Sequence, residues 1–176
     1  MHHQLWKKWR KIHTIWPAKD WLVSHIMLDL ALNTILARIK INRKYDIPYL
    51  AGYSKNGKTI YIDRHMPESF TYKGKKIKTD RYLILHEAVE KTLIDKLGLH
   101  YQYAHQIALR TEQAAVRADK ISWKDYDRFM QKYIKVIGDE SLTKVPPNLD
   151  TKPYRDEQDE ALLSLMKHAM CKPKTR

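Results

Sequence analysis

The sequence predicts an α+β fold that is predominantly helical, with a small antiparallel β-hairpin sheet. Several segments carry apolar residues at helical spacing, and glycine is rare, with 5 in 176 residues. Asn56 and Gly57 separate two short runs rich in Tyr and Ile, which is the strongest short-range signal for a hairpin. A chain of this length is expected to hold one domain with a real core and an appended arm.

Residues 1–45 are predicted to form a basic, Trp-rich arm followed by an amphipathic helix. LWKKWRKIHTIW interleaves Lys and Arg with aromatic residues, and apolar residues then recur at helical spacing from Leu22 to Ile39. Asp29 argues against a transmembrane segment, and no small-residue cleavage site of a secretory signal follows. We expect the helix to pack on the domain or on a partner. Docking of the Trp and Lys side chains on a membrane surface is the alternative.

Residues 46–140 are expected to form the central domain, which begins with β-structure. The runs IPYLAGYS and KTIYIDR predict a hairpin at about 48–64, because Asn and Gly tolerate the positive φ angles of its turn. The polar stretch HMPESFTYKGKKIKTD follows, and it allows a second, short strand pair that turns at Gly74.

Three helices complete this domain. Thr79 or Asp80 can cap the first helix, and Gly98 ends it. Ser122 and Asp125 have the spacing of a capping box at the start of the third. The helices are expected at about 80–97, 101–118 and 122–138. Residues of the third that recur at helical spacing are predicted to lie in the core: Trp123, Tyr126, Phe129, Met130 and Tyr133.

Residues 141–176 are predicted to be a Pro-containing linker and a C-terminal helix. The prolines of TKVPPNLDTKP block regular structure, and the helix follows at about 155–170. Cys171 is the single cysteine, so no disulfide forms within the chain, which suits a reducing compartment.

The charge is concentrated in the first part of the chain. The net charge is +13, and residues 1–78 carry 16 Lys and Arg against 5 Asp and Glu. The remaining residues carry 17 against 15, so they are nearly balanced. The basic half favours contact with an acidic partner such as nucleic acid, a membrane surface or an acidic protein, or it is a well-solvated surface.

The pentapeptide HEAVE lies in the middle of the first predicted helix. His86 and Glu90 are four positions apart and share a face, whereas Glu87 lies about 100° around the helix. An imidazole and a carboxylate on adjacent turns can hold a divalent cation, and a neighbouring Glu can act as base for a metal-bound water. The H-E-x-x-H helix of metalloproteases arranges its two ligands and its base in the same way, and here Glu90 replaces the second His. The alternative is a solvent-facing pair or a His–Glu hydrogen bond.

The next helix can supply the missing ligand. His105 and Glu112 are two turns apart on one face, with Ala108 between them, and the short turn after Gly98 makes the two helices antiparallel neighbours. Glu90 and His105 lie at similar distances from Gly98 along their helices. His86 and Glu112 also lie at similar distances from Gly98.

We therefore predict a zinc site between the two helices. The predicted ligands are His86, Glu90 and His105, and Glu87 is the general base that polarises the bound water. Glu112 is either a fourth ligand or a carboxylate that orients His105. His65 is a further candidate that approaches from the strand side. The alternative is an interhelical polar network without a metal.

Three stretches in this order, AGYSKNGKTIYIDR, LILHEAVEKTLID and YQYAHQIALRTEQAAV, carry a resemblance over about residues 47–135. The chain resembles uncharacterised bacterial and phage proteins with a zincin-like metallopeptidase pattern. The resemblance implies a zincin-like core, a peptide or protein substrate, and a substrate-binding edge at the 59–64 strand, with Tyr61 and Asp63. Glu90 departs from the usual second His of zincins, but it keeps a ligand there.

Two functions follow as hypotheses. The first is a zinc-dependent hydrolase, most simply a metallopeptidase, in the cytoplasm of a bacterial or phage-infected cell. The second is a non-catalytic phage or bacterial particle protein, virion-associated, whose basic N-terminal arm binds nucleic acid or a partner subunit.

Overall fold

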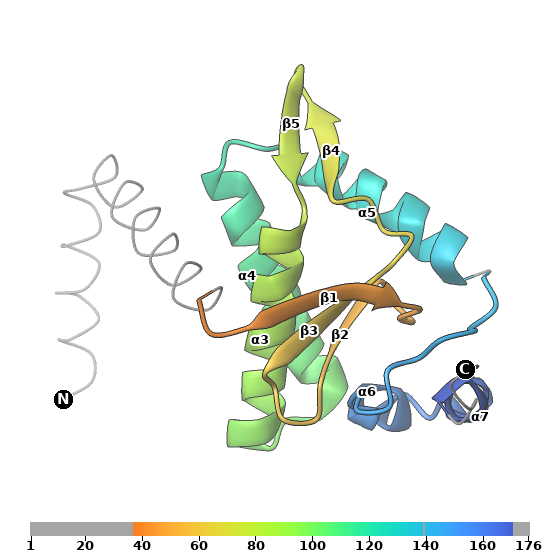
Figure 1. Cartoon of the computed structure of the whole chain (residues 1–176). Helices are drawn as coiled ribbons and strands as arrows, with labels where there is room; N and C mark the ends of the chain where they lie inside the picture. Colours follow the sequence, from red (N-terminus) through yellow and green to blue (C-terminus); the bar gives the residue numbers. More distant parts are fainter. Residues whose placement is uncertain (1–36, 139, 171–176) are drawn as a thin grey trace, which may run out of the picture.

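The computed structural model describes residues 37–138 and 140–170 (Figure 1). The predicted arm and helix up to residue 36 lie outside the described residues, as does Cys171. The described part is α+β and mainly helical, with two small sheets, so the predicted fold class is confirmed at this level. None of its helices is both long and apolar enough to cross a membrane.

Three strands form a mixed sheet in the order β1-β3-β2. β2 (Ala51–Tyr53) and β3 (Thr59–Asp63) are antiparallel, and Gly57 in their turn has a φ of 66°, which favours glycine. This pairing confirms the predicted hairpin. β1 (Lys40–Tyr45) runs parallel to β3 on its other side.

The position of β1 corrects two predictions. The sequence analysis placed 40–45 at the end of the arm segment, but these residues pair with β3, a distant partner that leaves no local pattern in the sequence. Because β1 and β2 occupy both sides of β3, the strand at 59–64 has no free edge. The substrate edge that the zincin resemblance implies at 59–64 is therefore wrong.

A second hairpin projects from the domain. β4 (Ser69–Tyr72) and β5 (Lys75–Lys78) are antiparallel and turn through Lys73 and Gly74, which both have positive φ angles. The predicted strand pair at Gly74 is confirmed.

The three predicted helices of the domain are present. They are α3 (Asp80–Leu97), α4 (Tyr101–Ala118) and α5 (Trp123–Gly138). The C-terminal helix predicted at about 155–170 is instead divided into α6 (Lys152–Asp156) and α7 (Glu160–Met170). The division occurs where Gln158 adopts a φ of 59° and the Asp159 carboxylate accepts a hydrogen bond from the Leu162 backbone N–H.

Helix α3 occupies the centre of the domain. It packs against β2 and β3 on one side and against α4 on another (Figure 1). Ile60 and Ile62 of β3 and Ile84 of α3 are at most 1% exposed and belong to one core cluster. The middle of α3, including His86 and Glu87, is thus enclosed by other elements, and its polar side chains must find partners there.

Asp46 attaches the segment after α5 to the sheet. Its Oδ2 accepts hydrogen bonds from the backbone N–H groups of Thr143 and Lys144 and from the Thr143 hydroxyl, at 2.7, 2.8 and 2.9 Å. Arg64 Nε lies 2.7 Å from Oδ1. Burial raises the pKa of Asp46, but these hydrogen bonds and the charge of Arg64 outweigh it and lower the pKa below 3.8.

Replacing this carboxylate should destabilise the fold in a pH-dependent way. We expect Asp46→Ala to lower the free energy of unfolding by about 1–3 kcal/mol, because the buried N–H groups lose their acceptor. Since the folded pKa is lowered, the stabilisation is complete above the unfolded pKa and is lost as the pH falls through the folded value. Urea denaturation at neutral and acidic pH should show the difference from wild type shrinking in acid. Glu68→Ala, at an exposed position, is the control, and an equal loss there would contradict the assignment.

Candidate metal centre

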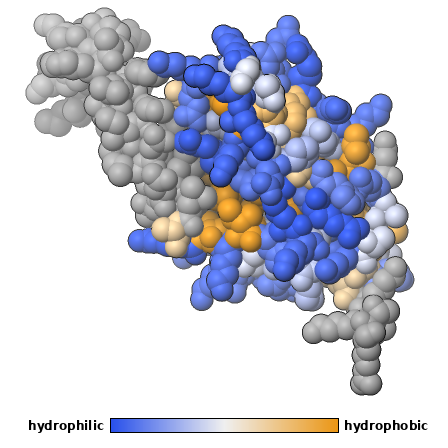
Figure 2. All heavy atoms as spheres, turned by 45° about the horizontal axis from the view of Figure 1, so that its top comes forward, coloured by the Kyte–Doolittle hydropathy of each residue, from blue (hydrophilic) through white to orange (hydrophobic). Residues whose placement is uncertain are grey.

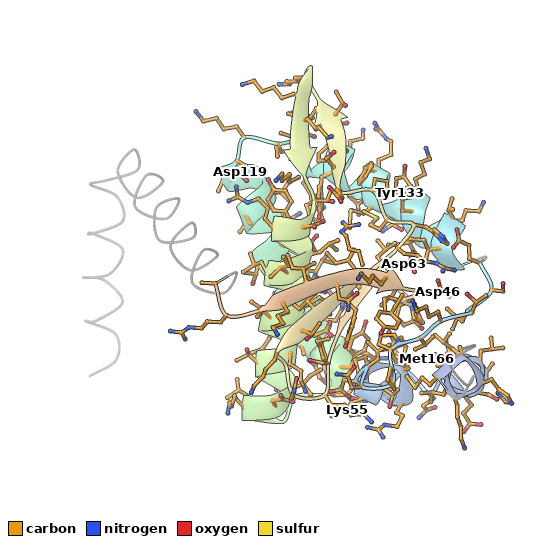
Figure 3. All side chains as sticks on the ribbon, viewed as in Figure 1. Asp46, Lys55, Asp63, Asp119, Tyr133 and Met166 are labelled. Carbon is orange, nitrogen blue, oxygen red and sulfur yellow. The ribbon has the colours of Figure 1, made fainter. Side chains whose placement is uncertain are left out.

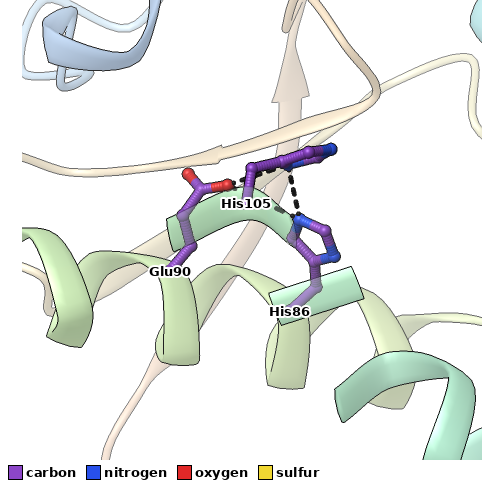
Figure 4. A group of neighbouring side chains, drawn as sticks. All are labelled: His86, Glu90 and His105. Atoms are coloured by element: carbon purple, nitrogen blue, oxygen red, sulfur yellow. Dashed lines mark hydrogen bonds and ion pairs between the residues drawn. The ribbon is translucent and has the colours of Figure 1, made fainter. Parts of the chain in front are cut away.

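Three side chains from α3 and α4 point their donor atoms at one another (Figure 4). His86 Nε2 lies 3.1 Å from His105 Nδ1, and His105 Nδ1 lies 3.0 Å from Glu90 Oε2. The third side of the triangle, between His86 Nε2 and Glu90 Oε2, is 3.5 Å. The predicted convergence of these three residues is thus present in the structure.

The triangle has the dimensions of one face of a zinc coordination tetrahedron. Zinc holds nitrogen and oxygen ligands at about 2.0–2.2 Å, which places neighbouring ligands about 3.3 Å apart. The three observed separations bracket this value. A cation above the triangle would contact all three donors and keep one position open.

Small residues let the two helices approach closely enough for this geometry. α3 ends at Gly98, whose φ is 64°, and α4 begins after a short turn, so the helices are antiparallel neighbours as predicted. Ala104, Ala108 and Ala115 on α4 are at most 1% exposed. Methyl groups at the helix contact leave room for the longer His and Glu side chains between them.

Glu112 binds the ring nitrogen of His86 that faces away from Glu90 and His105. The His86 Nδ1–H group donates to Glu112 Oε2 at 2.8 Å, and the Tyr126 hydroxyl donates to Glu112 Oε1 at 2.6 Å. This network holds a proton on Nδ1 and turns His86 Nε2 toward Glu90 and His105. Both Glu112 oxygens are engaged, which favours an orienting role over that of a fourth ligand.

The residue that Glu112 orients differs from the one expected. The sequence predicts that Glu112 orients His105 or is a fourth ligand, whereas in the structure its contact is with His86. The antiparallel helices explain the difference, because His86 and Glu112 lie at similar distances from Gly98 along their helices. His105 lies at the depth of Glu90, its ion-pair partner.

Glu87 is a buried carboxyl group in the same cavity. It is 8% exposed, and its carboxylate makes no hydrogen bond to another side chain in the described part of the chain. Burial, followed by the negative charge of Glu90, raises its pKa to about 8, with His86 opposing the shift and Glu112 adding to it. A carboxyl group with such a pKa can exchange a proton near neutral pH.

The two candidate ligands on α3, His86 and Glu90, shift each other's pKa. Burial lowers the pKa of His86, but hydrogen bonds to Glu112 and Glu90 outweigh it, so that the pKa rises to about 10. Burial raises the pKa of Glu90, but hydrogen bonds to His105 and His86 lower it overall. Without a cation, His86 therefore carries a proton between two carboxylates.

The centre opens into a cavity of about 180 Å³. A single water molecule needs only roughly 10–15 Å³ of such volume, so the cavity has room for water and part of a substrate. His105, with 37% of its side chain exposed, is the most accessible of the three donors. On this side the cavity adjoins a wider groove of about 690 Å³, which also contacts Tyr101 and His105.

Several tyrosines of the cavity were not predicted from the sequence. Tyr101 Oη lies 3.4 Å from His105 Nδ1, Tyr126 bonds Glu112, and Tyr53 has a hydroxyl with no hydrogen-bond partner in the described structure although it is 2% exposed. The four-residue spacing of Tyr101 and His105 on one helix could have revealed the first. Tyr53 and Tyr126 reach the site only through tertiary packing.

The last segment of the chain forms one wall of the cavity. Asp150 donates its backbone N–H to the Tyr53 carbonyl at 2.8 Å, and its carboxylate lies 2.8 Å from Lys91 Nζ. Pro153 and Tyr154 of α6 line the same space. A linker predicted to be irregular thus contributes to the site, although its sequence gives no chemical signal for this role.

His65 does not join the centre. Its Nδ1 atom contacts the Glu140 carboxylate at the end of the α5 segment, close to Asp63. His65 lines neither the cavity nor the neighbouring groove. The alternative that it approaches the metal site from the strand side is therefore wrong.

In comparisons with known proteins, no family model, no curated protein and no solved structure matches this chain. The zincin-like character of the core and the metallopeptidase resemblance accordingly stay predictions. The function is therefore inferred from the geometry of the centre.

Zinc should bind more tightly as the pH rises. In the metal-free protein His86 is protonated at neutral pH, because its pKa is about 10, and a cation must displace that proton. We expect the zinc affinity to increase at least about tenfold per pH unit around neutrality. Competition with a chromogenic chelator, corrected for the chelator's own titration, measures this. An affinity independent of pH would contradict a site built on His86.

Proposed function

We propose that this chain is a metal-dependent hydrolase, most simply a zinc peptidase, with Glu87 as its general base. The observation that carries the proposal is the triangle of His86, Glu90 and His105 donors at tetrahedral spacing. The buried carboxyl group of Glu87 lies in the same cavity. Ligands, base and cavity together make up what hydrolysis by an activated water requires.

The donor set suits zinc. Two imidazoles and one carboxylate with an open fourth position are typical of catalytic rather than structural zinc sites, which are usually closed by four protein ligands. When bound, zinc supplies a Lewis acid that polarises a substrate carbonyl and makes a water in the open position more acidic.

The protein side chains orient the ligands and transfer the proton. Tyr126 and Glu112 fix the tautomer and the orientation of His86. Glu87 accepts the proton from the attacking water and returns it to the leaving amine, a task for which a raised pKa is suited. The positive charge of a bound cation favours the ionised form of Glu87 that this first step needs.

A peptide is the substrate class that we propose, and β2 replaces β3 as the strand beside which it lies. β2 is an outer strand of the sheet and lines the cavity with Ala51 and Tyr53. At Tyr53 its outer side is already paired with Asp150. Ala51, two residues earlier, has its backbone N–H and carbonyl on the same side of β2, away from β3. An extended peptide could pair with these groups.

The substitution Glu87→Gln separates catalysis from metal binding. We expect at least about a hundredfold loss of hydrolysis of a fluorogenic peptide mixture by the zinc-loaded protein, because an amide cannot accept the proton. Zinc content and the circular dichroism spectrum should stay those of the wild type. Glu68→Gln, with the same change of charge at an exposed position, should retain full activity.

Two results would contradict the proposal. One is full activity of Glu87→Gln. The other is a wild-type protein that holds one zinc per chain and cleaves none of the peptides, which would make the centre structural.

A further inference from the structure

A second groove is lined by residues of β4, of the turn that follows it and of α5. Figure 1 shows where the β4–β5 hairpin and α5 lie in the fold. The volume of this groove is about 660 Å³, and it shares no lining residue with the metal cavity. We call it the hairpin groove; the residues that define it are Phe70, Tyr72, Lys73, Arg128, Phe129, Lys132 and Tyr133. It is therefore a separate surface with its own chemistry.

Aromatic rings form the floor and sides of the hairpin groove. Alternation along β4 places Phe70 and Tyr72 on one face of the hairpin. Phe129 stacks on Phe70 with ring centroids 5.0 Å apart, and Tyr133, one turn later on α5, lies 4.9 Å from Phe129. The sequence analysis placed Phe129 and Tyr133 in the core, but both are only partly buried and line this groove.

Cationic side chains lie beside these rings, because Lys73, Arg128 and Lys132 also line the groove. The hairpin turn and β5 carry four exposed Lys residues and no acidic residue over 72–78: Lys73, Lys75, Lys76 and Lys78. Neither they nor Lys132 form an ion pair in the described part of the chain. Among the described residues, Asp125 is the only acidic one that lines the groove, and Arg128 neutralises it with an N–O distance of 3.2 Å. The groove thus has an uncompensated positive charge.

Two lysines stand directly beside exposed parts of rings. Lys73 Nζ lies 5.3 Å from the centre of the Tyr72 ring, and Lys132 Nζ lies 5.4 Å from that of Tyr133. The pairs come from different elements, one from the hairpin and one from α5, and both line the groove. Each pair combines a group that binds phosphate with a flat surface on which a base can stack.

We propose that the hairpin groove binds single-stranded nucleic acid. Single strands expose both a charged backbone and unpaired bases, and proteins bind them through cationic grooves with aromatic stacking surfaces. An acidic peptide would satisfy the lysines but would not use the rings, and a duplex keeps its bases stacked internally. Hydrophilic residues predominate on the face that carries the hairpin end, with smaller hydrophobic patches between them (Figure 2), as expected for a polyanionic rather than an apolar partner.

The electrostatic part of this proposal is tested by removing two lysines. The binding of a labelled oligothymidylate to the full chain is followed by fluorescence anisotropy over a range of salt concentrations. Lys73→Ala/Lys132→Ala should bind more weakly, and the slope of log affinity against log salt should fall by about 1.4, because two phosphate contacts are lost. The N-terminal arm is present in every variant, so its contribution cancels in the comparison.

The control carries the same change of charge at another site. Lys55 and Lys58 are exposed in the β2–β3 turn, and Lys55 lies at the other end of the molecule from Tyr133 (Figure 3). Lys55→Ala/Lys58→Ala should keep the wild-type salt slope. Equal losses in the two double variants would overturn the proposal, because binding would then follow the net charge alone.

The aromatic part is tested by Tyr133→Leu, which keeps an apolar side chain but removes the ring. Affinity for the oligothymidylate should fall at least about fivefold. The salt slope should not change, since no charge is lost. Wild-type affinity in this variant, or tighter binding of duplex DNA or polyglutamate than of the single strand by the wild type, would overturn the assignment to single-stranded nucleic acid.

Discussion

The close approach of α3 and α4 determines the geometry of the candidate metal centre. Alanines at the helix contact leave space for His86 and Glu90 of α3 to meet His105 of α4. Larger side chains there would separate the helices and spread donor atoms that now lie within 3.5 Å of one another. The short turn at Gly98 fixes the register of the pair and therefore decides which residues face each other.

The buried acidic groups around this contact are the physical reason for proposing a cation there. Glu87, Glu90 and Glu112 are all at most 8% exposed, and they lie close to a buried imidazole. Burial, followed by the negative charge of Glu90, raises the pKa of Glu87, and hydrogen bonds to Glu112 and Glu90 raise the pKa of His86 against the effect of its burial. Burying such a group of charges costs stability, and apolar residues would pack at less cost. A divalent cation would neutralise the negative charge of these carboxylates. In the proposed site Glu90 would then be a ligand, Glu87 the base and Glu112 the residue that orients His86.

The sequence predicted the parts of the site that depend on local spacing. Helical periodicity and the Gly98 turn were sufficient to bring His86, Glu90 and His105 together, and the Asn56–Gly57 signal located the β2–β3 hairpin. The features that the sequence did not predict depend on contacts between residues far apart along the chain. β1 pairs with a strand far along the chain, and Tyr126 reaches Glu112 from a third helix. The partner of Glu112 was predicted wrongly as His105, although the distances of His86 and Glu112 from Gly98 along their helices are similar and the two residues are in contact.

A zinc site formed by His86, Glu90 and His105 is tested by the zinc content of the purified full chain, compared with that of His105→Ala after dialysis against a weak chelator. Elemental analysis should give one zinc per wild-type chain and a large loss in the variant, whose coordination triangle lacks one corner. The variant should keep the wild-type circular dichroism spectrum, since His105 is the most exposed of the three donors. Equal zinc in both proteins, or none in either after zinc loading, would contradict the account.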